Sequence, residues 1–157
     1  MIVKVSDLSA QVKVLDFFED TGPVNALVEA APGWAEQRLE GNLAVHAEIY
    51  RHGRDVTFVG NVSGTVWTVC PRCLDEFRWR LDRHFEFLIA PAQGRGDEED
   101  DMGLAHYSGD EIDLSPLVRE QAILALDQNV RCSESCRGLC PGCGVNLNHE
   151  PCRCGER

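Results

Sequence analysis

Alternation of hydrophobic and polar residues is the clearest pattern in this chain, and it runs from about residue 43 to residue 91. Leu43, Val45, Ala47 and Ile49 alternate with polar or small residues, which is the two-residue period of a strand with one buried face. The same period returns over 56–62 and 65–69, which Ser63-Gly64 separates, and over 77–81 and 85–89. Successive strands joined by short turns predict an antiparallel β-meander, or a partial barrel if the sheet curls.

The segments on either side of this region add little sheet and one helix. Residues 1–41 suggest only two short strands, at 2–5 and 12–15, with turns at 21–23 and 31–33. Ser115 and Pro116 read as an N-cap and a proline at the first helical position, and the hydrophobic residues after them predict one helix over about 115–127. The fold class is therefore α+β, with one main helix closing over the sheet. The acidic stretch 94–101 is expected to be a solvated loop.

Length and charge bound the organisation and the partners. A chain of 157 residues supports one domain, so we expect a β-rich core domain over 1–130 and a cysteine-rich tail over 131–157. The formal net charge of -11 disfavours general binding to nucleic acid or to anionic membranes. No stretch approaches the roughly 20 apolar residues of a membrane span, so we expect a cytoplasmic protein with reduced thiols.

Eight cysteines carry the strongest chemical signal. Cys70 and Cys73 form a C-x-x-C pair between two predicted strands, and six more form C-x3-C-x3-C-x2-C-x8-C-x-C from Cys132 to Cys154. In a reducing compartment such grouping favours metal ligation over disulfides, and eight thiolates suffice for two tetrahedral zinc sites. The preferred partition gives one ion Cys70, Cys73, Cys132 and Cys136, and the other Cys140, Cys143, Cys152 and Cys154. The tail would then be a zinc knuckle or ribbon packed on the 70–73 hairpin.

Three alternatives to two zinc ions stay open. The C-x-C end strains a compact loop, so one ion with unused thiols is the nearest rival. His149 could replace one cysteine, and an iron–sulfur cluster uses the same donors with different usual spacings. In every sulfur-closed case the ion is structural, because no position is left for a water that it could activate.

One catalytic signature has to be weighed against this. His46-Ala-Glu48 followed by Cys70-Pro-Arg-Cys73 is similar to the H-x-E…P-C-x-x-C signature of zinc deaminases. Val69 stands where that signature has proline, and His46 falls on a predicted strand, whereas the chemistry places it at the start of a helix. The sequence also contains no phosphate-binding loop, nucleophile elbow or H-E-x-x-H motif. We therefore expect no enzyme and no small-molecule substrate.

Several segments, taken in order, resemble a known family. They are Cys70-Pro-Arg-Cys73-Leu74, Glu111-Ile-Asp-Leu114, the helix end Ile123-Leu-Ala-Leu126, and Cys132-Ser-Glu-Ser-Cys136-Arg-Gly-Leu-Cys140-Pro-Gly-Cys143-Gly144. The arrangement resembles the YceD family of large ribosomal RNA subunit accumulation proteins over about residues 60–155. The resemblance implies a non-enzymatic factor needed for normal levels of 23S ribosomal RNA, acting during assembly of the large ribosomal subunit.

Charge qualifies how such a factor would contact its target. Residues 131–157 carry four arginines against three glutamates, a net charge of only +1. We therefore expect docking to a basic ribosomal or ribosome-assembly protein, with direct RNA contact through Arg72, Arg78 or Arg80 as the weaker option. A zinc-bearing protein–protein adapter without a ribosomal role is the alternative class.

Overall fold

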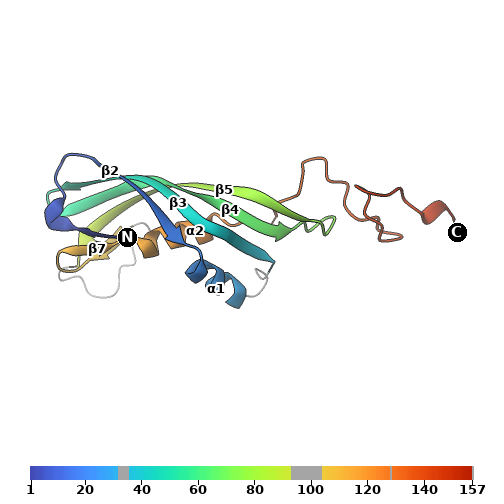
Figure 1. Cartoon of the computed structure of the whole chain (residues 1–157), viewed down its shortest axis with the longest axis horizontal. Helices are drawn as coiled ribbons and strands as arrows, with labels where there is room; N and C mark the ends of the chain where they lie inside the picture. Colours follow the sequence, from blue (N-terminus) through green and yellow to red (C-terminus); the bar gives the residue numbers. More distant parts are fainter. Residues whose placement is uncertain (32–35, 93–103, 128, 157) are drawn as a thin grey trace.

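The computed structural model describes residues 1–31, 36–92, 104–127 and 129–156. They form an elongated body, with a sheet layer and a helix layer, and a tail that extends from one end of it (Figure 1). In chain order the elements are β1 (Ile2–Lys4), η1 (Val5–Asp7), β2 (Lys13–Asp20), α1 (Gly22–Ala30), β3 (Gln37–His52), β4 (Asp55–Val69), β5 (Glu76–Pro91), β6 (Leu104–Tyr107), β7 (Glu111–Asp113), α2 (Ser115–Leu124) and η2 (Cys154–Glu156). The predicted acidic loop at 94–101 lies entirely outside the described residues.

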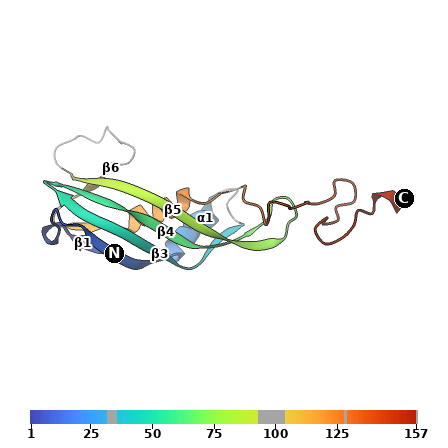
Figure 2. The same cartoon turned by 90° about the horizontal axis from the view of Figure 1, so that it is seen from above.

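The main sheet has five strands in the order β2-β3-β4-β5-β6. Its first four strands form the predicted antiparallel meander, and β6 pairs with β5 in parallel. The strands lie side by side with a pronounced twist and the sheet stays open, so it is a meander and not a partial barrel (Figure 2). A separate two-stranded ribbon joins β1 to β7. The α+β class is confirmed.

The long strands are less interrupted than the sequence suggests. The predicted break at Ser63-Gly64 is wrong, because β4 continues through it and both residues pair with β5. On the other side Ser63 pairs with β3, whose register shifts between Glu40 and Ala44. A Cβ added at Gly64 would lie 2.8 Å from Leu43 Cδ2, so the absence of a side chain here leaves room for that of Leu43. A small residue inside a strand can mark such a contact as well as a turn.

A second helix, α1, was not expected. Thr21-Gly22-Pro23 reads as a turn, but Thr21 is the N-cap of α1 and Pro23 lies in its first turn, where proline is tolerated. Val24 and Val28, one helical turn apart, are both buried. The expectation of strands and turns over 1–41 is therefore wrong at 22–30, because a proline-started helix and a turn share the same local signal.

The predicted helix after residue 115 is present but shorter. Leu114, not Ser115, is the N-cap of α2, and the helix ends at Leu124, not at 127. The side chain of Asp127 accepts a hydrogen bond from the Asn129 amide at 2.8 Å, a local turn that competes with continued helix. The buried carboxylate of Glu19 accepts hydrogen bonds from Ser115 Oγ and Arg119 Nε, which fixes α2 beneath β2.

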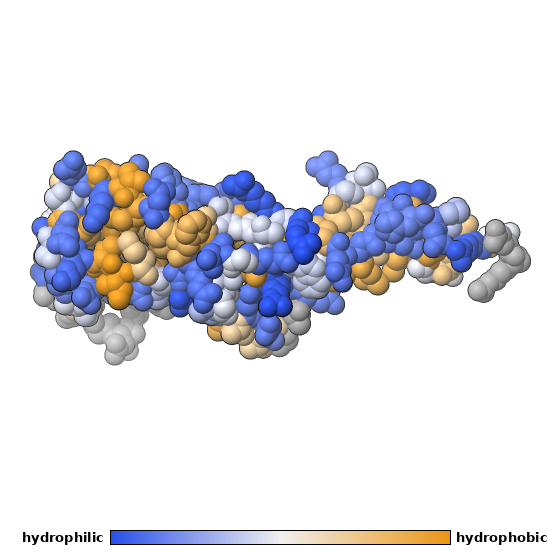
Figure 3. Space-filling view, viewed as in Figure 1, coloured by the Kyte–Doolittle hydropathy of each residue, from blue (hydrophilic) through white to orange (hydrophobic). Residues whose placement is uncertain are grey.

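The hydrophobic core fills the space between the sheet and the two helices. Its buried members run from Val3 to Leu126, with Val56, Phe58, Val62 and Val66 of β4 fully enclosed. The outer face of the sheet is solvated, and the largest hydrophobic area in Figure 3 lies over β2 at the end away from the tail. Val12, just before β2, and Val14 and Phe18 within it are exposed. Among the described residues, no helix has the length and hydropathy to cross a membrane.

Candidate metal centres

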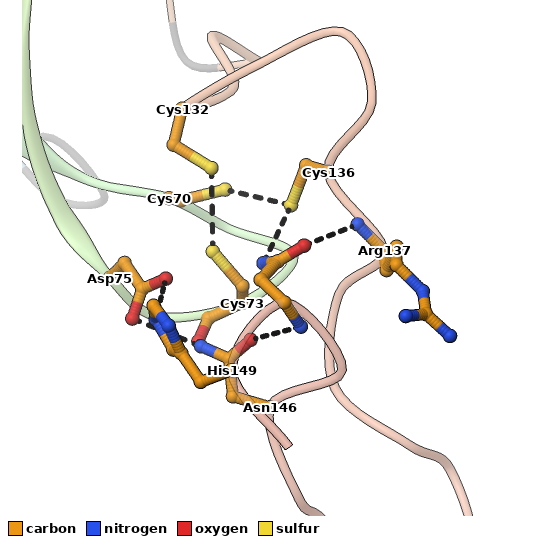
Figure 4. A network of polar contacts seen from close by, with 9 residues as sticks. Cys70, Cys73, Asp75, Cys132, Cys136, Arg137, Asn146 and His149 are labelled. Atoms are coloured by element: carbon orange, nitrogen blue, oxygen red, sulfur yellow. Dashed lines mark hydrogen bonds and ion pairs between the residues drawn. The ribbon is translucent and has the colours of Figure 1, made fainter. Parts of the chain in front are cut away.

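The first cysteine group joins the β4–β5 hairpin to the segment after α2. Cys70 and Cys73 lie just beyond the end of β4, and Cys132 and Cys136 approach them from the tail (Figure 4). All four Sγ atoms lie within 4.8 Å of one another, with 3.9 Å between Cys70 and Cys136 and 3.5 Å between Cys73 and Cys132. Cys70, Cys73 and Cys136 are buried, and of the described hydrophobic residues Phe77 and the half-buried Cys132 pack against them. Sulfur atoms take the place of a hydrophobic core here.

The second group lies farther out along the tail, beyond the end of the hairpin in both views (Figures 1 and 2). It gathers Cys140, Cys143, Cys152 and Cys154 to within 4.8 Å of one another, and Cys140 Sγ lies 3.4 Å from Cys152 Sγ and 3.6 Å from Cys154 Sγ. Only Cys140 is buried. The two groups contain the same residues as the preferred partition from the sequence, and each is positioned to hold a metal ion.

The two groups are built on the same turn, used twice. In Cys70-Pro-Arg-Cys73 the amide of Leu74 donates to Cys70 O at 2.9 Å, and the Cys70 amide donates to Asp75 O at 2.9 Å. In Cys140-Pro-Gly-Cys143 the amides of Gly144 and Cys140 make the equivalent bonds, to Cys140 O and Val145 O, each at 2.8 Å. The sequence analysis did not identify this repeat, because only the cysteines and the proline are shared.

Backbone N–H groups in each turn favour the thiolate form of its first cysteine. Burial opposes ionisation of Cys70, but the amides of Cys132, Arg72 and Cys73 donate to its sulfur, and its pKa falls to about 6. The amides of Cys143 and Gly142 likewise lower the pKa of Cys140 to about 6. Such N–H donation to sulfur is what holds a metal-binding thiolate in place.

The remaining thiols of each group respond to their neighbours. Burial raises the pKa of Cys73, and hydrogen bonding with Cys152, Cys140 and Cys143 raises that of Cys154 to about 12. Four adjacent sulfurs cannot all ionise without a cation between them, because each new thiolate repels the others. Each group therefore presents the thiol-rich, partly ionised donor set that a divalent ion completes.

A polar network ties the tail to the hairpin (Figure 4). Asn146 Nδ2 donates to Cys73 O at 3.1 Å and to Asp75 Oδ1 at 3.0 Å. Arg72 O accepts from the Leu139 amide at 2.9 Å, and Asn148 Nδ2 donates to Cys136 Sγ at 3.6 Å. Sequence reasoning missed Asn146, Asn148 and Asp75. Their only signal was two asparagines in a tail otherwise rich in cysteine and glycine.

His149 belongs to this network and to neither cysteine group. Its Nε2 lies 2.9 Å from Asp75 Oδ2. Burial opposes ionisation of Asp75, but hydrogen bonds from Asn146 and His149 outweigh it and lower the pKa of the carboxyl. His149 thus supports the hairpin and does not replace a cysteine.

The residues of the deaminase signature are not brought together. His46 pairs with Asp16 at 2.7 Å on the solvated face of the sheet, and its neighbour in β4 is Asn61. Asn61 lies nine residues before Cys70 along the sequence, which at 3.3 Å per residue is roughly 30 Å. His46 and Glu48 therefore do not reach the cysteines.

The three arginines considered for RNA contact differ in their surroundings. Arg78 forms a two-point ion pair with Glu40, and Arg80 lies 3.7 Å from Asp82. The exposed Arg72 lies at the hairpin tip, inside the first cysteine turn. Two of the three are thus already neutralised by neighbouring carboxylates.

Comparison with known proteins places these features in a family context. A family model described as "Large ribosomal RNA subunit accumulation protein YceD" matches residues 58–157. The matched segment begins in β4 and contains both cysteine groups, the hairpin and α2.

The chain is also similar to curated proteins over part of its length. Uncharacterized proteins of Mycobacterium tuberculosis and Mycobacterium bovis are 33% identical over 99 residues, which covers 61% of this chain and 47% of each relative. The chain thus spans about half the length of these mycobacterial proteins. The chloroplastic "Large ribosomal RNA subunit accumulation protein YCED homolog 1" of Arabidopsis thaliana is 39% identical over 46 residues, 29% of this chain and 14% of that protein. No solved structure gives a significant match.

Proposed function

The chain belongs to the YceD family, and from this premise we propose that it is a non-enzymatic cytoplasmic factor that supports 23S ribosomal RNA accumulation. Its role would be in assembly of the large ribosomal subunit. The observation that carries the proposal is the extent of the family match, which includes both cysteine groups and the hairpin between them. The family description and that of the Arabidopsis relative both name large ribosomal RNA subunit accumulation.

We further propose that both groups bind structural zinc. A tetrahedral ion with Zn–S bonds of about 2.3 Å requires sulfurs about 3.8 Å apart. The Sγ–Sγ separations of 3.5 and 3.9 Å in the first group, and 3.4 and 3.6 Å in the second, lie close to that value. Four sulfurs fill the coordination of such an ion, so zinc would stabilise the fold of the tail instead of activating water.

The charge distribution supports a protein partner. The net charge of -11 repels phosphate, and the ion pairs of Arg78 and Arg80 reduce what these two side chains can offer to RNA. A basic ribosomal or assembly protein is electrostatically complementary to the chain. The proposal is therefore an assembly factor that reaches the particle through protein contacts.

Sedimentation tests the proposal. We expect the native chain to travel with large-subunit precursors in a low-salt gradient, and to leave them as salt rises, because the contact is largely electrostatic. A strain lacking the protein should have less 23S RNA relative to 16S RNA, restored by the wild-type gene. A chain that stays at the top of the gradient, with normal 23S RNA in the deletion strain, would instead support an adapter without a ribosomal role.

Metal analysis tests the zinc part separately. Elemental analysis of the purified chain should give two zinc ions per molecule, and a Cys140→Ser variant should give one. Iron in place of zinc, or one ion in the wild type, would contradict the two-site assignment.

A further inference from the structure

The two cysteine turns place different residues at the same backbone position. Leu74 follows Cys73 with φ of 62°, and Gly144 follows Cys143 with φ of 73°. In this left-handed region the Cβ of an L-residue approaches its own backbone too closely, whereas glycine has no such conflict. Among described non-glycine residues, Leu74 is the one with positive φ. The second turn therefore uses the residue that backbone sterics favour, and the first does not.

Packing within the chain does not explain this choice. The Leu74 residue is 61% exposed, and the buried cluster around the first group contains Phe77 and the cysteines but not Leu74. An exposed leucine alone needs no explanation, since single apolar residues are common on protein surfaces. A leucine that is both exposed and held in a strained conformation is different, because the strain is retained without compensation from burial.

The location of Leu74 favours an intermolecular contact. It lies at the tip of the hairpin, where its amide donates to Cys70 O and the carbonyl of Cys73 before it accepts from Asn146, so the backbone that carries this exposed side chain is fixed. An apolar side chain on a fixed backbone loses only its rotamer freedom, and no backbone freedom, when it enters a pocket on a partner. Exposed Pro71 and Arg72 flank it in the same turn.

We propose that Leu74 is the apolar anchor through which the 70–75 hairpin docks into an apolar pocket, with a basic rim, on a protein partner. Residues 70–76 carry Arg72 against Asp75 and Glu76, a net charge of -1, and with the net charge of -11 of the whole chain they complement such a rim. Leucine has no aromatic ring on which a base could stack and no donor for phosphate, so the contact is with protein and not with RNA. The docking contact is independent of the proposed function. Only the expectation that the partner belongs to a large-subunit precursor rests on it.

A reciprocal pair of substitutions tests whether Leu74 makes the first turn less stable than glycine would. We expect zinc-loaded Leu74→Gly to resist thermal unfolding and chelation at least as well as the wild type. Gly144→Leu should be less resistant, and because a Cβ at Gly144 meets nothing within 4 Å, its loss would report backbone strain alone. If Leu74→Gly instead unfolds as readily as a buried-leucine truncation, Leu74 is a packing residue and the proposal is overturned.

Site-specific photocrosslinking tests the contact itself. A benzophenone amino acid at position 74 should give an adduct with one protein, and the same probe at Leu124, which is 59% exposed on α2, should not. Excess wild-type chain should compete for the adduct, whereas folded Leu74→Gly should compete at least tenfold less well. An RNA adduct, no adduct, or equal competition by Leu74→Gly would each overturn the proposal.

The two proposals fail in different ways. If the wild type travels with large-subunit precursors and Leu74→Gly does so equally, the docking role of Leu74 is wrong and the ribosomal function stands. If the wild type stays out of those fractions but position 74 still gives the competed protein adduct, the ribosomal function is wrong and the docking role stands.

Discussion

Asn146 offers the most direct test of how the tail is held on the hairpin. Its side chain donates to Cys73 O at 3.1 Å and accepts from the Asn148 amide at 3.0 Å, and both of these bonds are between neutral groups. At about 1 kcal/mol for each, Asn146→Ala should destabilise the junction between the two turns by about 2 kcal/mol. The third bond ends on the half-buried carboxylate of Asp75, which His149 also contacts, so its loss adds little to this figure.

Native-state hydrogen exchange measures this loss. The informative amides are those of Leu139, which donates to Arg72 O, and Leu147, which donates to Gly138 O. A loss of about 2 kcal/mol should speed their exchange roughly 30-fold in the zinc-loaded protein, while amides in β4 keep their protection. The pKa of Asp75 should also rise towards its ordinary value, because Asn146 is one of the donors that lower it.

Asn61→Ala is the matched control. Asn61 makes a single side-chain bond, to Asp82 on the solvated face of the sheet, and its removal should leave Leu139 and Leu147 unchanged. If Asn146→Ala also leaves these two amides unchanged, the network does not hold the tail, and the reasoning about the junction is refuted.

Three further predictions concern metal, packing and pH. Chelation at neutral pH should remove exchange protection from 130–156 and 70–75 but not from the sheet, because the hydrophobic core ends at Leu126; protection that survives verified metal loss would contradict this. Gly60→Ala should lower the free energy of unfolding by about 1–3 kcal/mol in denaturant titrations, since its Cβ would lie 2.5 Å from Ala47 Cβ, whereas Gly155→Ala, which meets nothing within 4 Å, should be neutral. The Ser6 hydroxyl and amide lower the pKa of Asp110. The contribution of this carboxylate to the free energy of unfolding should therefore be complete above the ordinary pKa of 3.8 and be lost as pH falls through the lowered pKa. Faster exchange of the Val5 amide at acid pH, absent in Asp110→Ala, would show this loss.

Sequence patterns gave the central strands because one physical effect dominates there. The period-two alternation over 43–49 and 77–89 records one buried and one solvated face, and β3, β4 and β5 follow it. Helix α1 was not predicted, because its short apolar face, Val24 and Val28, is stabilised by packing under the sheet. The parallel partner of β5 could not be foreseen, because pairing direction depends on tertiary path and not on local pattern.

The cysteine groups were more accessible to sequence reasoning than their supports. Thiols have few roles in a reduced protein, so eight of them in two close spacings leave few partitions to consider. Asn146 and Asp75 are ordinary surface residue types, and their role arises only once the hairpin and tail meet. The strained conformation of Leu74 was equally hidden, since nothing in Cys-Pro-Arg-Cys-Leu announces a positive φ.

The sequence separation of the ligands orders the steps by which the two centres can load. Cys70 and Cys136 are 66 residues apart, whereas Cys140 and Cys154 are 14 apart. In an unfolded chain, closing the longer loop costs about 1.4 kcal/mol more, roughly a tenfold handicap, before any sheet exists to shorten it. In an unfolded full-length chain the outer centre can therefore bind its ion first, whereas the inner one binds after β4, β5 and α2 have brought its two pairs of cysteines together.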